Sequence, residues 1–104
     1  MMLFGNMKEA STEIVAEGVT RRLLSTGERI QVFLLEMKGG ITVPEHAHVN
    51  EQASYVVKGR FETTVGGEKG ILSEGYWVRI PSNVPHSGFI FEDTILIDIY
   101  SPPR

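Results

Sequence analysis

Three histidines are the residues of this chain best suited to chemistry. His46 and His48 are separated by one residue, and His86 follows a proline-containing turn later in the sequence. Because successive side chains of a β-strand point to opposite faces, the spacing of His46 and His48 directs both imidazoles to one side. Gln52 shares that parity. Neutral imidazoles are common ligands of mid-sized divalent metals, and three of them with an amide oxygen could hold an ion and leave coordination positions open.

Two other interpretations of these residues stay open at this point. The histidines could be unrelated surface or core residues. Alternatively, they could lie together inside the fold without binding a metal. Glu51 has the opposite parity to Gln52, so we expect its carboxylate to point away from the histidines.

The segment Thr94–Tyr100 has two different faces. Ile95, Ile97 and Ile99 lie on one face, and Leu96, Asp98 and Tyr100 lie on the other. A carboxylate inside a small barrel is costly unless it is paired, hydrogen-bonded or close to a cation. Near a divalent ion and a substrate, Asp98 could act as a general acid or base, although it could also simply accept hydrogen bonds at a strand end.

The elements that would position these residues are short strands. Eleven glycines and five prolines punctuate the chain, and they separate runs rich in β-branched and aromatic residues. Seven or more short strands in 104 residues predict a sandwich or a barrel. Met7–Ala16 could form a helical turn or an edge strand. The predicted strands are Val19–Ser25, Ile30–Met37, Gln52–Lys58, Arg60–Val65, Tyr76–Ile80, Gly88–Phe91 and Thr94–Tyr100.

Length and composition predict one folded domain over residues 1–104, with a barrel at about 30–100 and an N-terminal strand or arm at 1–29. The hydrophobic fraction of 41% argues against disorder, and no apolar run is long enough to span a membrane. Scattered basic residues and a net charge of −3 make nucleic acid an unexpected partner. The absence of cysteine excludes disulfides and thiolate ligands. With no secretory signal visible, a cytoplasmic location is the default expectation.

Two stretches resemble the motifs of the cupin family. Gly40, five residues, His46-Ala47-His48, three residues, Gln52, six residues and Gly59 match the first motif, with Gln52 in the glutamate place. Gly75, five residues, Pro81, Asn83 and His86 resemble the second motif, although Asn83 replaces a glycine and Ile90 replaces the usual asparagine. The resemblance implies an all-β, double-stranded β-helix (jelly-roll) barrel. It also implies a divalent metal (Zn, Ni, Mn or Fe) in the lumen, held by His46, His48, Gln52 and His86.

Glutamine in place of glutamate changes the charge of such a site. The protein ligands leave a dication uncompensated, so the site should be a stronger Lewis acid, prefer an anionic ligand and bind its metal less tightly.

The terminal run from Asp98 to Arg104 resembles the small pectin-degradation cupins called KdgF. Those proteins convert unsaturated uronates to open-chain ketones. The resemblance implies acid–base work at Asp98, an aromatic wall at Tyr100 and a substrate-carboxylate contact at Arg104.

Three functions are therefore in competition. The first is a metal-dependent enzyme acting on a sugar acid or a similar oxygenated small molecule, with a small and anionic substrate expected. The second is a non-catalytic module that binds a small ligand or a metal, and the third is a cupin dioxygenase with Fe(II). We also expect a homodimer, because the face that carries Ile95, Ile97 and Ile99 needs a cover. The segment Ile14–Leu24 could supply that cover, either within the chain or across a two-fold axis.

Overall fold

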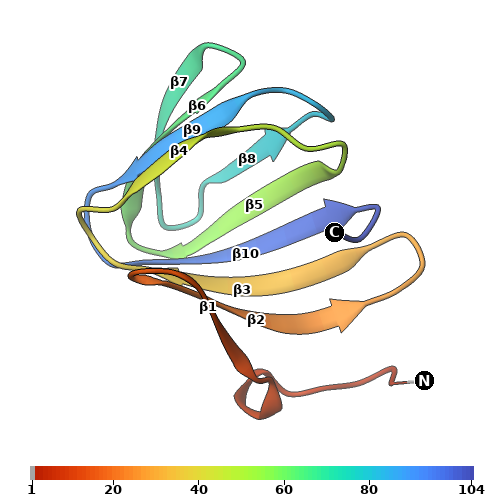
Figure 1. The fold of residues 1–104 in the computed structure, drawn as a ribbon. Helices are drawn as coiled ribbons and strands as arrows, with labels where there is room; N and C mark the ends of the chain where they lie inside the picture. The colour runs from red at the N-terminus through yellow and green to blue at the C-terminus, as the bar shows by residue number, and fades with distance from the viewer. Residues whose placement is uncertain (1) are drawn as a thin grey trace.

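The computed structural model describes residues 2–104, and almost all of its regular structure is β-strand (Figure 1). A short 3₁₀ helix, η1 (Met7–Glu9), precedes the first strand. None of the helices in this part of the chain is long and apolar enough to cross a membrane. The strands are β1 (Thr12–Ala16), β2 (Val19–Thr26), β3 (Gln31–Met37), β4 (Thr42–His46), β5 (Glu51–Lys58), β6 (Arg60–Val65), β7 (Glu68–Ser73), β8 (Trp77–Ile80), β9 (His86–Ile90) and β10 (Thr94–Ser101).

The strands form two antiparallel sheets that face each other (Figure 1). One sheet has the order β1-β2-β3-β10-β5-β8, and the other has the order β4-β9-β6-β7. From β3 onward the chain changes sheet at almost every connection, so strands distant in sequence become neighbours. The predicted all-β class and its double-sheet jelly-roll form are confirmed.

The interior of the barrel changes from apolar to polar along its length. Val56 of β5 and Leu96 of β10 belong to a buried apolar cluster, together with Val19, Met37, Phe61, Leu72 and Ile90. Further along the same inward faces lie polar side chains, Gln52 and Ser54 on β5 and Asp98 on β10. Because β5 and β10 are antiparallel, the start of one and the end of the other meet at the same end of the barrel. The apolar cluster closes one end, and the polar residues gather at the other.

The seven predicted strands are all present, with ends shifted by at most two residues. Both expectations for Met7–Ala16 have a counterpart, since the 3₁₀ helix is followed by the edge strand β1. The idea that Ile14–Leu24 covers the isoleucine face within the chain is wrong. β1 and β2 extend the same sheet sideways instead of packing over it, and Ile14 is 78% exposed.

Candidate metal centre and cavity

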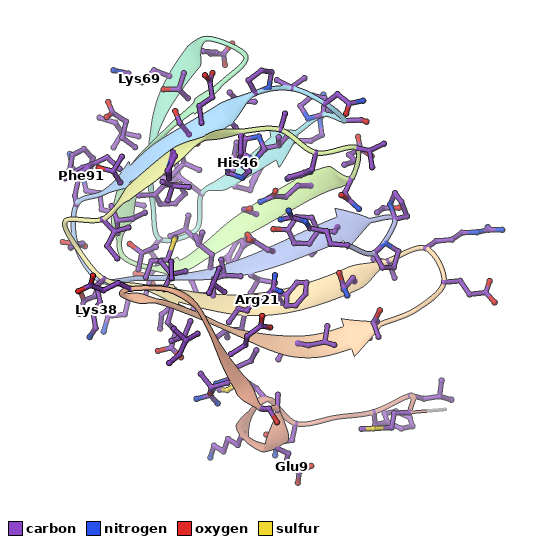
Figure 2. The ribbon with its side chains drawn as sticks, in the orientation of Figure 1. Glu9, Arg21, Lys38, His46, Lys69 and Phe91 are labelled. Atoms are coloured by element: carbon purple, nitrogen blue, oxygen red, sulfur yellow. The ribbon has the colours of Figure 1, made fainter. Side chains whose placement is uncertain are left out.

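The three histidines come together at the polar end of the barrel. His46 ends β4 and His86 begins β9, and these two residues are direct cross-strand partners. His48 lies in the loop that leads to β5, and its ring centroid is 5.0 Å from that of His86. One nitrogen from each ring lies within 4.8 Å of the others. Figure 2 shows His46 projecting from β4 into the space between the two sheets.

Backbone carbonyls fix the orientation of all three rings. The Nδ1 atoms of His46, His48 and His86 lie 2.9 Å from the carbonyl oxygens of Pro44, Asn50 and Val84, respectively. A carbonyl oxygen only accepts, so each Nδ1 carries the hydrogen and donates it. In a neutral imidazole the lone pair is then on Nε2, the atom that remains free to bind a metal.

Two features of this cluster fit a cation. Nε2 of His86 is buried and finds no hydrogen-bond partner within residues 2–104, and burial lowers the pKa of His86, which favours the neutral ligating form. Oε1 of Gln52 lies 3.1 Å from Nε2 of His48. Both of these atoms offer lone pairs, so a positive ion bound by both would relieve the repulsion. The residues present therefore suit a divalent metal held by three imidazoles and one amide oxygen.

A hydrogen-bond chain connects this cluster to a buried carboxyl group. Nε2 of Gln52 donates to Oγ of Ser54 over 3.0 Å, and Ser54 donates to Oδ1 of Asp98 over 2.6 Å. The hydroxyl of Tyr100 donates to Oδ2 of Asp98 over 3.3 Å. Burial raises the pKa of Asp98, and the hydrogen bonds from Ser54 and Tyr100 oppose that rise. The pKa of Tyr100 is raised as well, mainly by burial, so its hydroxyl keeps its proton.

A cavity of about 360 Å³ joins the histidine cluster and the carboxyl group. His46, His86, Asp98 and Tyr100 line it, together with two arginines, Arg21 and Arg104. The guanidinium of Arg104 lies 5.2 Å from the ring centroid of Tyr100, and its backbone N–H donates to Oε1 of Gln31. The cavity therefore brings together a candidate metal centre, the titratable carboxyl group of Asp98 and the side chains of two arginines.

Sequence reasoning missed two of the residues in this cavity. Ser54 shares the inward parity of Gln52, so its place in a polar run was available as a signal. Charged side chains are mostly exposed, so the sequence favours a solvated surface position for Arg21 over a place inside or at the rim. Arg21 lines the cavity instead, where its guanidinium stacks 4.6 Å from the ring centroid of Phe33 and pairs with Glu13 on the edge strand. The carboxylate of Glu51 points outward, as expected, and pairs with Arg79.

The fold and the histidine cluster together define the class of protein. The chain is a small antiparallel double-sheet barrel whose interior carries a three-histidine cluster with the donor set of a metal centre. Residues 33–97 match the family model of the cupin domain, and the chain belongs to the cupin family.

Several known cupins are similar to this chain, and the length of the similar region differs among them. The pectin degradation protein KdgF of Dickeya dadantii (strain 3937) is 30% identical over 98 residues, which cover 92% of this chain and 89% of that protein. The structure of KdgF from Halomonas sp. superimposes with a TM-score of 0.93 and 28% identity, over 100% of this chain and 96% of that one. Quercetin 2,3-dioxygenase of Bacillus subtilis (strain 168) is 34% identical over 64 residues, which are 61% of this chain but only 19% of that enzyme.

Proposed function

We propose that this protein is a metal-dependent enzyme that isomerises an unsaturated sugar acid to its open-chain ketone. The observation that carries the proposal is the buried carboxyl group of Asp98 in the same cavity as the histidine cluster. A module that only binds a ligand has little need for a titratable group buried in this way. Similarity to the pectin degradation protein along nearly the whole chain supports a sugar-acid substrate.

The proposed metal ligands are His46, His48, Gln52 and His86. When bound there, a divalent ion would supply Lewis acidity toward an oxygen of the substrate. Gln52 adds no negative charge, so an anionic substrate would meet a net positive centre. The hydrogen bonds from the imidazoles to backbone carbonyls hold the ligating nitrogens in position beforehand.

The proposed reaction moves one proton and leaves the atom count unchanged. The anomeric hydroxyl of the unsaturated uronate loses its proton and becomes the aldehyde oxygen, while the bond between the anomeric carbon and the ring oxygen breaks. The electrons of that bond pass to the ring oxygen, which becomes the ketone oxygen, and the electron pair of the alkene takes up a proton at carbon. Asp98 is the residue we assign to accept the first proton and return it to carbon, because its pKa is raised by burial and Tyr100 and Ser54 hold its two oxygens.

The proposed substrate is anionic, and two residues of the cavity suit its carboxylate. A guanidinium can hold a carboxylate through two parallel hydrogen bonds. Arg104 lies at the wall formed by Tyr100, so we assign it the substrate carboxylate. Arg21 is already paired with Glu13, which leaves it the weaker candidate for this contact.

Loss of the alkene absorbance of unsaturated uronates tests the proposal directly. Protein purified without a histidine tag is first analysed for metal by mass spectrometry and then assayed with and without a chelator. We expect metal-dependent turnover, and we expect His46→Ala to lose both bound metal and activity while the barrel stays folded on its apolar cluster. Failure of Zn, Ni, Mn and Fe to bind the wild-type protein in calorimetry would refute the metal site.

A second function is an Fe(II) dioxygenase, which the similarity to quercetin 2,3-dioxygenase favours. Oxygen consumption by the iron-loaded protein distinguishes the two enzymes, because isomerisation needs no oxygen. Binding of a uronate without either reaction would leave the non-catalytic module.

We also propose that the protein is a homodimer. The outward face of the larger sheet carries apolar side chains from three neighbouring strands, and no segment among residues 2–104 packs over it as a second layer.

A further inference from the structure

We propose that Ser54 is a positioning residue that turns the amide oxygen of Gln52 toward the histidine cluster. The inference rests on the proposed metal site and deepens it. Ser54 lies on the inward face of β5, two residues after Gln52 and directly across from Asp98 on β10. It is 4% exposed, and its hydroxyl contacts both of these side chains.

The hydroxyl of Ser54 has one hydrogen, which it donates to Asp98 in a hydrogen bond. The 2.6 Å from Oγ to Oδ1 is typical of a hydroxyl that donates to a carboxylate. The lone pairs of Oγ can then only accept, and they do so from Gln52 over 3.0 Å. An amide donates through nitrogen alone. Ser54 therefore selects the nitrogen end of the amide and sends its oxygen toward His48, 3.1 Å away.

The opposite amide orientation would suit His48 better in the absence of a cation. The amide nitrogen could then donate to the lone pair on the imidazole of His48. That arrangement would require Ser54 to donate to Gln52, which would remove a donor from Asp98. Asp98 is 3% exposed, and a buried carboxyl group that loses a donor is destabilised. Because Asp98 needs the hydrogen of Ser54, the hydroxyl of Ser54 can only accept from Gln52, and this fixes the orientation of the Gln52 amide.

A glutamine ligand needs such a device, whereas a glutamate ligand does not. Both oxygens of a carboxylate can bind a metal, so either orientation of the group is competent. An amide presents its oxygen in one orientation and an NH₂ group, which repels a cation, in the other. Ser54 compensates for this handicap by fixing the orientation before the ion binds.

Zn²⁺ affinity, measured by calorimetry with a competing chelator, tests the role of Ser54. Ser54→Ala should weaken Zn²⁺ binding by about 10- to 100-fold, the usual range when a supporting hydrogen bond is removed. Ser54→Thr keeps the hydroxyl and should stay close to the wild type. Thr63→Val is the matched control. Thr63 is buried and lines the same cavity, but its hydroxyl donates to the backbone carbonyl of Ser87.

A double-mutant cycle with Gln52→Ala separates positioning from general damage. If Ser54 acts through the amide, Ser54→Ala should cause no further loss once Gln52 is an alanine. An equal loss in both backgrounds, or unchanged affinity in Ser54→Ala, would overturn the inference. Wild-type protein that binds none of Zn, Ni, Mn and Fe would overturn the proposed function together with it, and if the wild type binds one of these ions but not Zn²⁺, the cycle is measured with that ion. Should Ser54→Ala not fold, Ser54→Cys replaces it, since a thiol is a weak donor and acceptor; wild-type affinity there would also refute the role.

Discussion

At the scale of single residues, two hydrogen bonds and burial decide what the carboxyl group of Asp98 can do. Asp98→Asn keeps the size of the side chain and an oxygen for Ser54, but it removes the titratable proton. We expect this variant to fold and to bind metal as the wild type does, while turnover on the unsaturated uronate falls by about 10²–10⁴-fold. Metal analysis and the absorbance assay are carried out on the same preparation. Unchanged turnover would remove Asp98 from the mechanism.

The charge of the metal site rests on Gln52. Gln52→Glu adds a negative charge beside the ion, so metal affinity should increase even though a carboxylate cannot donate to Ser54. The attraction between a carboxylate and the divalent ion that it binds directly is stronger than one hydrogen bond to a neutral hydroxyl. Binding of an anionic substrate should weaken in return.

Glu51→Gln is the matched control for that variant. Glu51 precedes Gln52 in the chain, but it is exposed and pairs with Arg79 on the outer face. Calorimetry with Zn²⁺ should show little change in Glu51→Gln. Weaker metal binding in Gln52→Glu would contradict an amide ligand at this position.

The residues of the site differed in how readily the sequence revealed them. His46, His48 and His86 were found because strand parity and motif spacing are local properties of the chain. Asp98 was found in the same way, from alternation along one strand. The link from Gln52 through Ser54 to Asp98 depends on the register between β5 and β10, which is a long-range property that spacing does not contain. Arg21 was missed because charged side chains are mostly exposed, and the stacking on Phe33 that holds it in the cavity is also a cross-strand contact.

At the scale of elements, the strands β4 and β7, which are not among the predicted strands, escaped prediction for a common reason. β4 contains Pro44, which cannot donate to a ladder, and β7 begins with charged residues and a glycine. Both are edge strands of the smaller sheet, where one side of the backbone needs no partner. Weak local propensity is sufficient there because the neighbouring strand supplies the pairing. The central strands, which must pair on both sides, were all predicted, and so was β8, an edge strand of the larger sheet that carries Trp77, Val78 and Ile80.

The turn between β5 and β6 gives a prediction at this scale. Gly59 has φ +103°, and a Cβ there would lie 2.6 Å from both the carbonyl oxygen of Asp93 and the Cα of Thr94. Gly75 also has a positive φ, +87°, but a Cβ there meets nothing within 4 Å. Gly59→Ala combines backbone strain with a collision against backbone, so it should destabilise the fold by roughly 3 kcal/mol or more, whereas Gly75→Ala should cost about 1–2 kcal/mol.

Urea unfolding of the two alanine variants measures that difference. The comparison isolates the collision, because both variants share the unfavourable backbone conformation. Equal losses of unfolding free energy would mean that the turn adjusts to accept a side chain at position 59.

At the scale of the whole molecule, the outward face of the six-stranded sheet exposes apolar side chains that no other segment of residues 2–104 covers. Ile97 and Ile99 are only half-buried there, and Tyr55 and Trp77 beside them are 48% and 72% exposed. The arm before β1 adds exposed apolar side chains at residues 2–4, and Figure 1 shows this arm lying beyond β2. An apolar face of this extent is typical of a protein–protein contact. A second copy related by a two-fold axis would present the same face and bury both.

Sedimentation velocity at micromolar concentration tests the dimer, and two matched substitutions locate its interface. Tyr55 is the cross-strand partner of both Ile97 and Trp77, so Tyr55→Arg would place a charge in the middle of the outward face. Ile71 is similarly exposed, 50% against 48%, but it lies on β7 of the other sheet. We expect the wild type and Ile71→Arg to sediment with twice the mass of the chain, and Tyr55→Arg to sediment as a monomer with its barrel intact, because burying an unpaired guanidinium in an apolar contact is costly. A wild-type protein of single-chain mass would refute the dimer, and a dimeric Tyr55→Arg would move the interface away from this sheet.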